Sequence, residues 1–437
     1  MVDYQKIIKL GKAAGFSDLE IVERGSENLE IRYFKGEVEN NETSFNQHFT
    51  IKGIYNDIQT FASYEDLNID EEKVINTLKE NAEVINTDEK GDIFAGSKEY
   101  PKNRKLEHDF VTISLDKKIE LLASMEQKLK AADKRIVNIP YLSYFEQGNY
   151  CNMINSKGLD IQKDNKSCGL LVEIVAKEGE DTKSEFKMEV NSSLSKIDVD
   201  KLINDCVSRA LSMLNAKSVE SGTYPIIVEN EGMASLFASV ASIFSGESAI
   251  KKLTPLLDKE GEQIMSDKIT IIDAPLKEDA TNYEPFDNEG VACYNKDVVK
   301  NGKFITFLHD LKSAKYFKTK STGNSFGGGA RGCNLYIKNG NYSKEKMTSS
   351  IKKGLMLTSF DGLHAGINPV SLDFSLKTSG FLIENGKITR PVTLIVAAGN
   401  FLKMMNDVEC IGNDLKITSY GIGSPSIMFK GLSISGN

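Results

Sequence analysis

The sequence contains few of the residues from which hydrolytic metal sites are usually built. It has only four histidines, His48, His108, His309 and His364, and none lies within a helical turn of another. A paired-histidine motif such as H-E-x-x-H therefore cannot form along one helix. We interpret His48 and His108 as surface or edge residues. His364, in the glycine-rich segment DGLHAGINP, is the one histidine to which we assign a functional prospect.

Disulfide frameworks and membrane spans are also absent from the sequence. The six cysteines are scattered without a C-x-x-C pair, as expected for reduced thiols in a cytoplasmic protein. The start MVDYQKIIKLGKAAG lacks the continuous apolar region of a signal peptide. No apolar run approaches the roughly 20 residues that a spanning helix needs. We therefore expect a cytoplasmic protein without a membrane association.

Positive charge is not concentrated anywhere in the chain. The formal net charge is −8 and the pI about 5.4. The most basic stretch, 312–320, is interrupted by aromatic and hydroxyl residues and is typical of a solvated helix face. Direct binding of nucleic acid is thus not expected. Hydrophobic residues make up 40% and charged residues 27%, which is an ordinary globular mixture.

No nucleophile or phosphate-binding motif stands in the context that its chemistry needs. SGESA at 245–249 lacks the strand-to-helix turn that would expose an elbow serine, and the GGGARG run at 327–332 lacks the Lys-Ser/Thr pair of a P-loop. The acidic residues Asp287, Glu289 and Asp373 stand beside turns, where carboxylates commonly cap backbone amides. From these residues we name no catalytic, cofactor-binding or metal-binding group.

The first half of the chain predicts two α+β modules in succession. At 437 residues, two or three domains are expected. Residues 1–90 show a helix over about 4–14, short strand-like runs such as 19–25 and 29–36, and a closing helix over about 70–82. Residues 106–217 repeat this order, with helices over about 115–131 and 199–214. The polar stretch 87–105 is interpreted as an interdomain connection.

Residues 222–437 have a different character. After one helical window, 231–244, short β-type runs dominate, and turns at Asn301-Gly302 and Asn385-Gly386 are typical of hairpins. We predict a mostly antiparallel β domain, either a sandwich or a distorted barrel. The fold class is therefore α+β, with two small helix/antiparallel-sheet modules followed by this β domain.

Several motifs in the last third resemble the TldD/PmbA family of metalloproteases, also called the modulator of DNA gyrase family. They are FDNEGV (286–291), residues 301–324, residues 368–392, AAGN (397–400), IGNDL (411–415) and GSPS (423–426). The resemblance implies a role in proteolysis. In the family, a TldD subunit holds zinc with an H-E-x-x-x-H helix and a downstream cysteine. It pairs with a PmbA (TldE) subunit, and the pair cleaves unfolded peptides.

The window that matches the zinc helix is EGMASLFASVASIFSG, residues 231–246. Aligned on Leu236-Phe237, it has Ala238 and Ile243 at the histidine positions and Ser239 at the general-base position. Only KITSY, residues 416–420, separates the GNDL motif from the closing glycine segment, so the third ligand also has no counterpart. The resemblance is therefore to the PmbA (TldE) branch, with zinc expected in a TldD-like partner and no cofactor in this chain.

The leading interpretation is a non-catalytic subunit that encloses and holds an unfolded peptide beside a TldD-like subunit's zinc. Peptide addition as a strand would suit varied substrates, because main-chain hydrogen bonds do not depend on side chains. If a loop here lines the peptide groove, we expect it to be 362–374. Its candidate residues are His364, Asn368, Ser371, Asp373 and Phe374, and turn capping is the alternative role for them.

Two other hypotheses remain open from the sequence. The chain could act alone as a homodimeric binding or regulatory protein that engages DNA gyrase or an antitoxin. It could also be an autonomous hydrolase with an unrecognised site near His364 and Asp373. Partner binding separates the first from the subunit hypothesis, and metal analysis with a peptidase assay separates the second.

Overall fold

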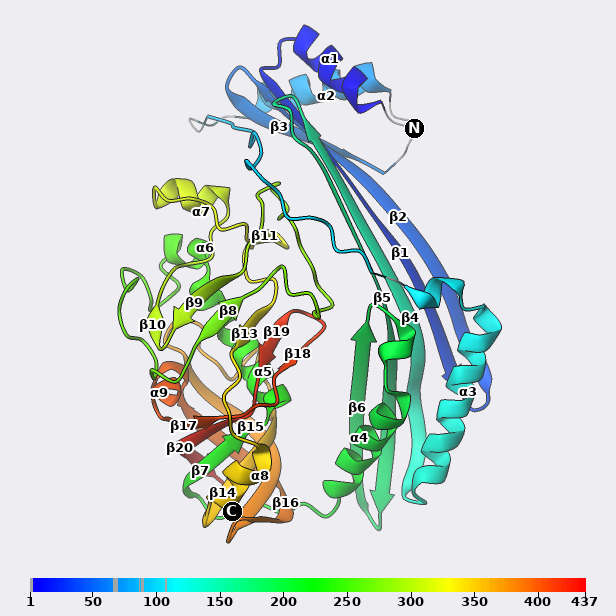
Figure 1. Ribbon diagram of the computed structural model, residues 1–437, viewed down its shortest axis with the longest axis vertical. Helices are drawn as coiled ribbons and strands as arrows, with labels where there is room; N and C mark the ends of the chain where they lie inside the picture. Colours follow the sequence, from blue (N-terminus) through cyan, green and yellow to red (C-terminus); the bar gives the residue numbers. More distant parts are fainter. Residues whose placement is uncertain (1–2, 66–69, 86, 88–89, 107) are drawn as a thin grey trace.

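The computed structural model describes residues 3–65, 70–85, 87, 90–106 and 108–437. An elongated sheet with four helices lies beside a β-rich unit formed by the second half of the chain (Figure 1). The elongated sheet has six strands in the order β3-β2-β1-β4-β5-β6. Their bounds are β1 Asp18–Phe34, β2 Glu37–Tyr55, β3 Ile58–Tyr64, β4 Ile136–Asn155, β5 Asp160–Glu178 and β6 Asp181–Asn191.

The two predicted α+β modules are halves of this one sheet. Strand β1 of the first pairs with β4 of the second over thirteen positions, from Glu20↔Asn155 to Arg32↔Ser143. The short strand-like runs predicted at 19–25 and 29–36 are parts of one long strand, because 19–25 and 29–34 both lie in β1 and residues 35–36 form the turn to β2. The middle of this strand is less buried than its start, so apolar alternation lapses there while the backbone pairing continues.

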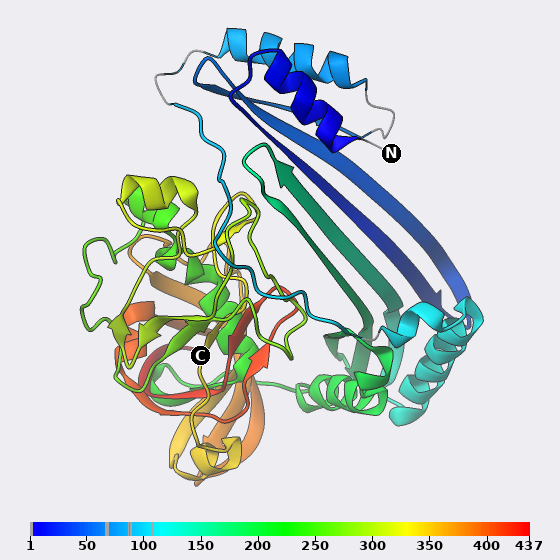
Figure 2. The ribbon, with the colours of Figure 1, turned by 45° about the horizontal axis from the view of Figure 1, so that its top comes forward.

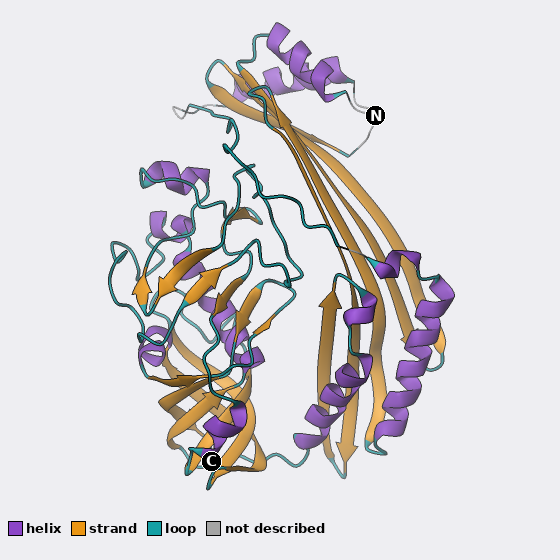
Figure 3. Ribbon diagram, viewed as in Figure 1, coloured by secondary structure: helices purple, strands orange, loops and turns teal. Residues whose placement is uncertain are grey.

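Four helices cover one face of the sheet, two at each end (Figure 3). Helices α1 (Tyr4–Ala13) and α2 (Glu71–Val84) pack on Leu19 and Ile21, whereas α3 (Leu115–Ala132) and α4 (Val199–Ser212) pack on Ile31 and Tyr33. These four residues of β1 are an even number of positions apart and so share a face. All four helices were predicted to within a few residues. Asp70 caps α2 as expected, accepting from Glu72 N at 3.1 Å.

The opposite face of the sheet meets the second half of the chain. There Val22 and Cys151 pack with Phe286. The connecting segment passes between sheet and domain without a helix or strand over residues 90–106 (Figure 2). Tyr100 donates to Gly290 O at 2.7 Å and Arg104 to Ala280 O at 2.7 Å, so this segment fastens the domain to the sheet. Residues 88 and 89 of the predicted connection lie outside the described residues.

The second half contains a closed five-stranded barrel and a second sheet. The barrel runs β16-β15-β14-β7-β20 and closes through a β16–β20 pairing, with β17 added at β20. The other sheet has the order β10-β9-β8-β13-β19-β18. Among the described strands of this half, only β14–β7 and β13–β19 are parallel, so the mostly antiparallel β prediction is confirmed. The strands are β7 Gly222–Val228, β8 Ile271–Asp273, β9 Lys296–Lys300, β10 Lys303–Phe304, β13 Leu335–Ile337, β14 Lys353–Asp361, β15 Asp373–Glu384, β16 Lys387–Asn400, β17 Val408–Ile411, β18 Lys416–Ile417, β19 Ile422–Ser424 and β20 Ile427–Ser435.

The turns predicted from Asn-Gly pairs in the second half of the chain are present in the structure. Asn301 and Asn385 have positive φ angles of 48° and 49° and, with the glycines that follow, turn the predicted hairpins. The GGGARG run also forms a hairpin, with Gly327 and Gly328 at the turn between β11 (Ser325–Phe326) and β12 (Gly329–Ala330). Within the described ranges, no helix is long and apolar enough to cross a bilayer.

Candidate functional site

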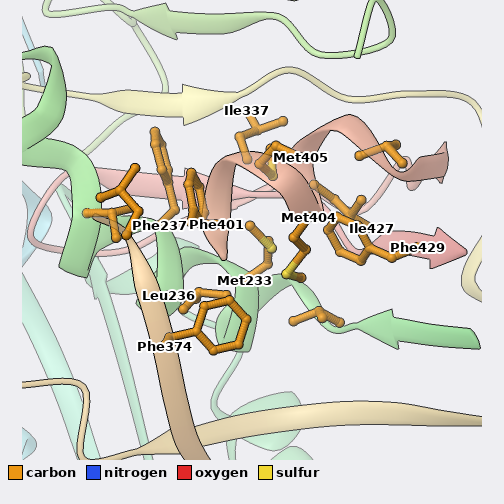
Figure 4. Packing of buried hydrophobic residues seen from close by; sticks show 14 of the residues in the cluster. Met233, Leu236, Phe237, Ile337, Phe374, Phe401, Met404, Met405, Ile427 and Phe429 are labelled. Atoms are coloured by element: carbon orange, nitrogen blue, oxygen red, sulfur yellow. The ribbon is translucent and has the colours of Figure 1, made fainter. Parts of the chain in front are cut away.

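Helix α5 (Asn230–Val240) is the element that the resemblance aligns with the zinc helix. It follows strand β7 and lies between β14 of the barrel and β19 of the second sheet. Leu236 and Phe237 are fully buried, and the Phe237 ring stacks on Phe401 at 6.4 Å between centroids. Figure 4 shows this packing, with Met233 on the same helix. The inner side of α5 is therefore an ordinary apolar core.

Close packing fixes α5 against the barrel. A Cβ atom at Gly232 would stand 2.9 Å from the carbonyl oxygen of Thr358 in β14, so a larger residue would push the helix away. The hydroxyls of Ser235 and Ser239 donate to carbonyls of their own helix, Glu231 O at 2.9 Å and Leu236 O at 2.6 Å. These side chains satisfy the backbone and present no free base.

The residues present do not fit a zinc ion. Ala238 has no donor atom, Ser239 is bonded to its own helix, and Ile243 is 0% exposed in the core. In the part of the chain that the structure describes, no three His, Cys, Asp or Glu side chains gather as metal ligands. Cys410 lies in β17 with Sγ 3.9 Å from the sulfur of Met428, and burial raises the pKa of its thiol.

A groove of about 480 Å³ lies beside the start of α5, between β6, α4 and the β14–β15 pair. Glu231 at the start of α5 bonds to Lys187 of β6 at 2.5 Å and to Lys416 of β18 at 2.9 Å. Lys416 also reaches Glu189 at 2.9 Å. Burial alone would raise the pKa of Glu231, but the two lysines outweigh it and hold the pKa at about 2. The carboxylate is thus a structural anion rather than a proton acceptor.

Of the five residues predicted for a peptide groove, three form one turn. Asn368 Oδ1 accepts from Ser371 N at 3.0 Å, and Ser371 Oγ donates to Asp373 Oδ2 at 2.8 Å. Asn400 donates to Asp373 Oδ1 at 2.9 Å, and these hydrogen bonds from Asn400 and Ser371 lower the pKa of Asp373. In the structure these three side chains cap the loop before β15, which is the alternative role noted above.

The other two predicted residues lie apart. Phe374 is 4% exposed and belongs to the core cluster of Leu236, next to which Figure 4 shows its ring. His364 is exposed and makes no hydrogen bond or ion pair with any described residue. An open hollow lies along the loop and is bordered by Asn368 and Asp373. The structure therefore brings His364 and Asp373 into no shared catalytic arrangement.

The acidic residues of the FDNEGV motif are caps, as predicted. Asp287 is fully buried and accepts from Glu289 N at 2.9 Å, Val291 N at 3.0 Å and Ser325 N at 2.9 Å. Glu289 accepts from Leu311 N at 2.8 Å, at the start of α7 (Leu311–Tyr316). Burial raises the pKa of Glu289 to about 7, with a smaller contribution from the neighbouring Asp287 carboxylate.

Sequence reasoning missed a second pocket, of about 340 Å³, between the elongated sheet and the loop around Tyr283. Arg24 of β1 and Lys163 of β5 both line it, although they lie 139 residues apart in the chain. The pairings of β1 with β4 and of β4 with β5 bring them together, and no local pattern encodes the first of these. The alternation of polar residues along 24, 26 and 28 was the one available signal.

Comparison with known proteins gives the class to which this fold belongs. Models of the PmbA/TldA metallopeptidase central and C-terminal domains match residues 108–214 and 221–436. The metalloprotease PmbA of Escherichia coli O157:H7 is 31% identical over 330 residues, covering 74% of this chain and 71% of that protein. A metalloprotease of Methanocaldococcus jannaschii is 24% identical over 432 residues, covering 96% and 94%. The chain belongs to the TldD/PmbA family.

Two solved structures share the fold over nearly the whole length. A Thermotoga maritima protein proposed to be a modulator of DNA gyrase superposes with a TM-score of 0.92 at 27% identity, covering 99% of both chains. TldE from Thermococcus kodakarensis superposes with a TM-score of 0.90 at 24% identity, again covering 99% of both. Both the elongated sheet and the barrel domain are therefore features of known members of this fold.

Proposed function

We propose that this chain is a PmbA (TldE)-type subunit of a metalloprotease complex that degrades or processes unfolded peptides. In this proposal it works in the cytoplasm, contributes neither zinc nor a catalytic residue, and helps to enclose and hold the peptide. The observation that carries the proposal is the segment 238–243, at the end of α5 and in the 3-10 turn that follows it, where Ala238, Ser239 and Ile243 occupy the aligned zinc-site positions. The names of its relatives support a role in proteolysis.

Peptide hydrolysis at a zinc site needs a metal-bound water and a base to deprotonate it. Neither can be built on α5, because its inner side is core and its serine hydroxyls are bonded to helix carbonyls. The proposal therefore assigns zinc to a TldD-like partner. The loop 362–374 remains our candidate for lining the groove, with His364 as its exposed side chain and Asn368, Ser371 and Asp373 holding its shape.

Reconstitution with a TldD-like chain tests this proposal. Casein would be incubated with this chain, with the TldD-like chain, and with both mixed in equal amounts. We expect chelator-sensitive cleavage by the mixture and none by this chain, together with co-elution of the two chains. Chelator-sensitive cleavage by this chain alone would support the autonomous-hydrolase hypothesis. A stable homodimer that does not bind the TldD-like chain would favour the stand-alone regulatory hypothesis.

A further inference from the structure

The face of the elongated sheet that meets the second domain carries an ordered polar row. His48 of β2, Arg24 of β1, Cys151 of β4 and Lys163 of β5 are successive backbone partners across four strands. Side chains of directly paired residues point to the same face, with Cβ atoms roughly 5 Å apart. These four side chains thus stand in one line, and all four border the pocket of about 340 Å³.

A second polar row runs parallel to the first. Asn46, Ser26, Asn149 and Asn165 are likewise successive partners on β2, β1, β4 and β5. Each lies two residues from a member of the first row, so both rows share the same face. The floor of the pocket is therefore rich in amide and hydroxyl groups, which can hydrogen-bond to a peptide backbone.

The loop around Tyr283 forms the rim opposite this floor and is held firmly. Lys163 donates to Phe286 O at 2.6 Å and forms an ion pair with Glu284. The Tyr283 ring faces the Arg104 guanidinium at 5.0 Å. Lys163 and Glu284 thus neutralise each other, and their role is to hold the rim in place.

Among the described residues that border this pocket, Arg24 is the cation that has no such partner. It is half-buried, and within the described ranges the one hydrogen bond of its guanidinium is a long contact of 3.4 Å from Nη2 to Asn288 O. No described carboxylate forms an ion pair with it. Asp164 also borders the pocket, but it follows Lys163 directly and so projects from the other face of β5. A guanidinium with free donors favours a carboxylate, which it can bind through two parallel hydrogen bonds.

We propose that this pocket binds a carboxylate of a peptide, with Arg24 as the anchor and the amides of the second row supporting the adjoining backbone. The carboxylate could belong to a C-terminus or to an acidic side chain. The choice of a peptide as ligand rests on the proposed function. A volume of about 340 Å³ lies at the lower end of the range for small-ligand sites and suits a terminal segment of a few residues.

Binding of short peptides to the full chain, measured by calorimetry, tests the proposal without any protease assay. The probes are acetyl-trialanine with a free C-terminus and its C-terminal amide. A second pair, acetyl-Ala-Glu-Ala amide and acetyl-Ala-Gln-Ala amide, tests the acidic side chain as the source. We expect at least one carboxylate probe to bind at least tenfold more tightly than its amide. Equal binding within both pairs, or no binding at all, would overturn the proposal.

Three variants place the effect at Arg24. Arg24→Gln removes the guanidinium, and Asn149→Asp adds a repelling carboxylate at an exposed position while leaving Arg24 and its Asn288 contact intact. Each variant should bind the carboxylate probe at least tenfold more weakly than the parent. The thermal unfolding of Asn149→Asp should be unchanged. Lys166→Gln, which removes a charge that pairs with Glu27 on the other face of β5, should leave binding unchanged. Parent-like binding by both pocket variants would refute the site, whereas failure of the reconstituted protease would bear only on the proposed function.

Discussion

Lys187 of β6 and Glu231 of α5 form an ion pair of 2.5 Å between the elongated sheet and the C-terminal domain. The pair places a sheet edge directly beside the helix that in TldD-type chains is expected to carry zinc. Lys416 adds a second cation to the same carboxylate at 2.9 Å. The start of α5 therefore takes part in joining the two halves of the molecule.

Glu231→Gln should weaken the protein in a pH-dependent way. The folded pKa is about 2 against 4.5 for an unperturbed glutamate, so the stabilisation is present above pH 4.5 and is lost as pH falls through 2. Thermal unfolding should show a deficit for the variant at pH 6 that shrinks steadily towards pH 2. Glu83→Gln, at an exposed position of α2, is the control and should show no deficit. A deficit that is constant with pH would contradict the assignment.

Gly232→Ala should destabilise the fold by about 1–3 kcal/mol, because the added methyl group meets a backbone oxygen that cannot move aside. A Cβ atom placed ideally at position 232 lies 2.9 Å from Thr358 O. Ser235→Ala, one turn further along α5, removes a hydroxyl that bonds only to its own helix and is the matched control. Urea unfolding measures both, and equal stability of Gly232→Ala and the parent would show that α5 is not packed so closely.

Phe237→Ala should cost about 3–5 kcal/mol, the usual penalty for deleting a fully buried aromatic ring. The ring stacks on Phe401 and meets Phe244 edge-on, so its loss leaves a cavity between α5 and the barrel. Leu394, which is 67% exposed, provides the contrast, since Leu394→Ala should change stability by less than about 0.5 kcal/mol. Similar losses for the two variants in urea unfolding would be incompatible with α5 as core.

Glu289→Gln should stabilise the protein above neutral pH relative to the parent. Burial raises the folded pKa to about 7, so the glutamate's favourable contribution is complete below pH 4.5 and is lost as pH rises through 7. The glutamine keeps an acceptor for Leu311 N but has no charge to bury. Denaturant unfolding at pH 5 and pH 8 should show the variant gaining about 1–3 kcal/mol on the parent between the two. A pH-independent difference would contradict the raised pKa.

Local sequence signals predicted the elements of this fold better than their assembly. The apolar stripes of α1 to α4 and the asparagine turns at 301 and 385 depend on residues that are near in sequence. The positions of these helices and turns were therefore predicted to within a few residues. The pairing of β1 with β4 joins residues more than 100 positions apart. Nothing local encodes it, so one sheet was interpreted as two modules. The polar middle of β1 also concealed the continuity of that strand.

In the candidate site, too, the features that depend on single residues could be predicted, and those that depend on long-range contacts could not. The side chains of Ala238 and Ser239 in α5, and of Ile243 in the 3-10 turn after it, could be read directly from the sequence, because a missing donor atom needs no three-dimensional information. The role of the loop 362–374 could not be decided from the sequence, since groove-lining and turn-capping residues have the same polar composition. The pocket at Arg24 depends on long-range strand pairing and became visible only in the folded chain.

Zinc binding by the isolated chain is the most direct test of the account. The purified protein would be dialysed against excess Zn²⁺, desalted, and its metal content measured beside that of a TldD-like chain and of the two chains together. We expect far less than one zinc per molecule of this chain and about one per pair, with the metal following the TldD-like subunit. One tightly held zinc per molecule of this chain alone, accompanied by chelator-sensitive peptide cleavage, would contradict it.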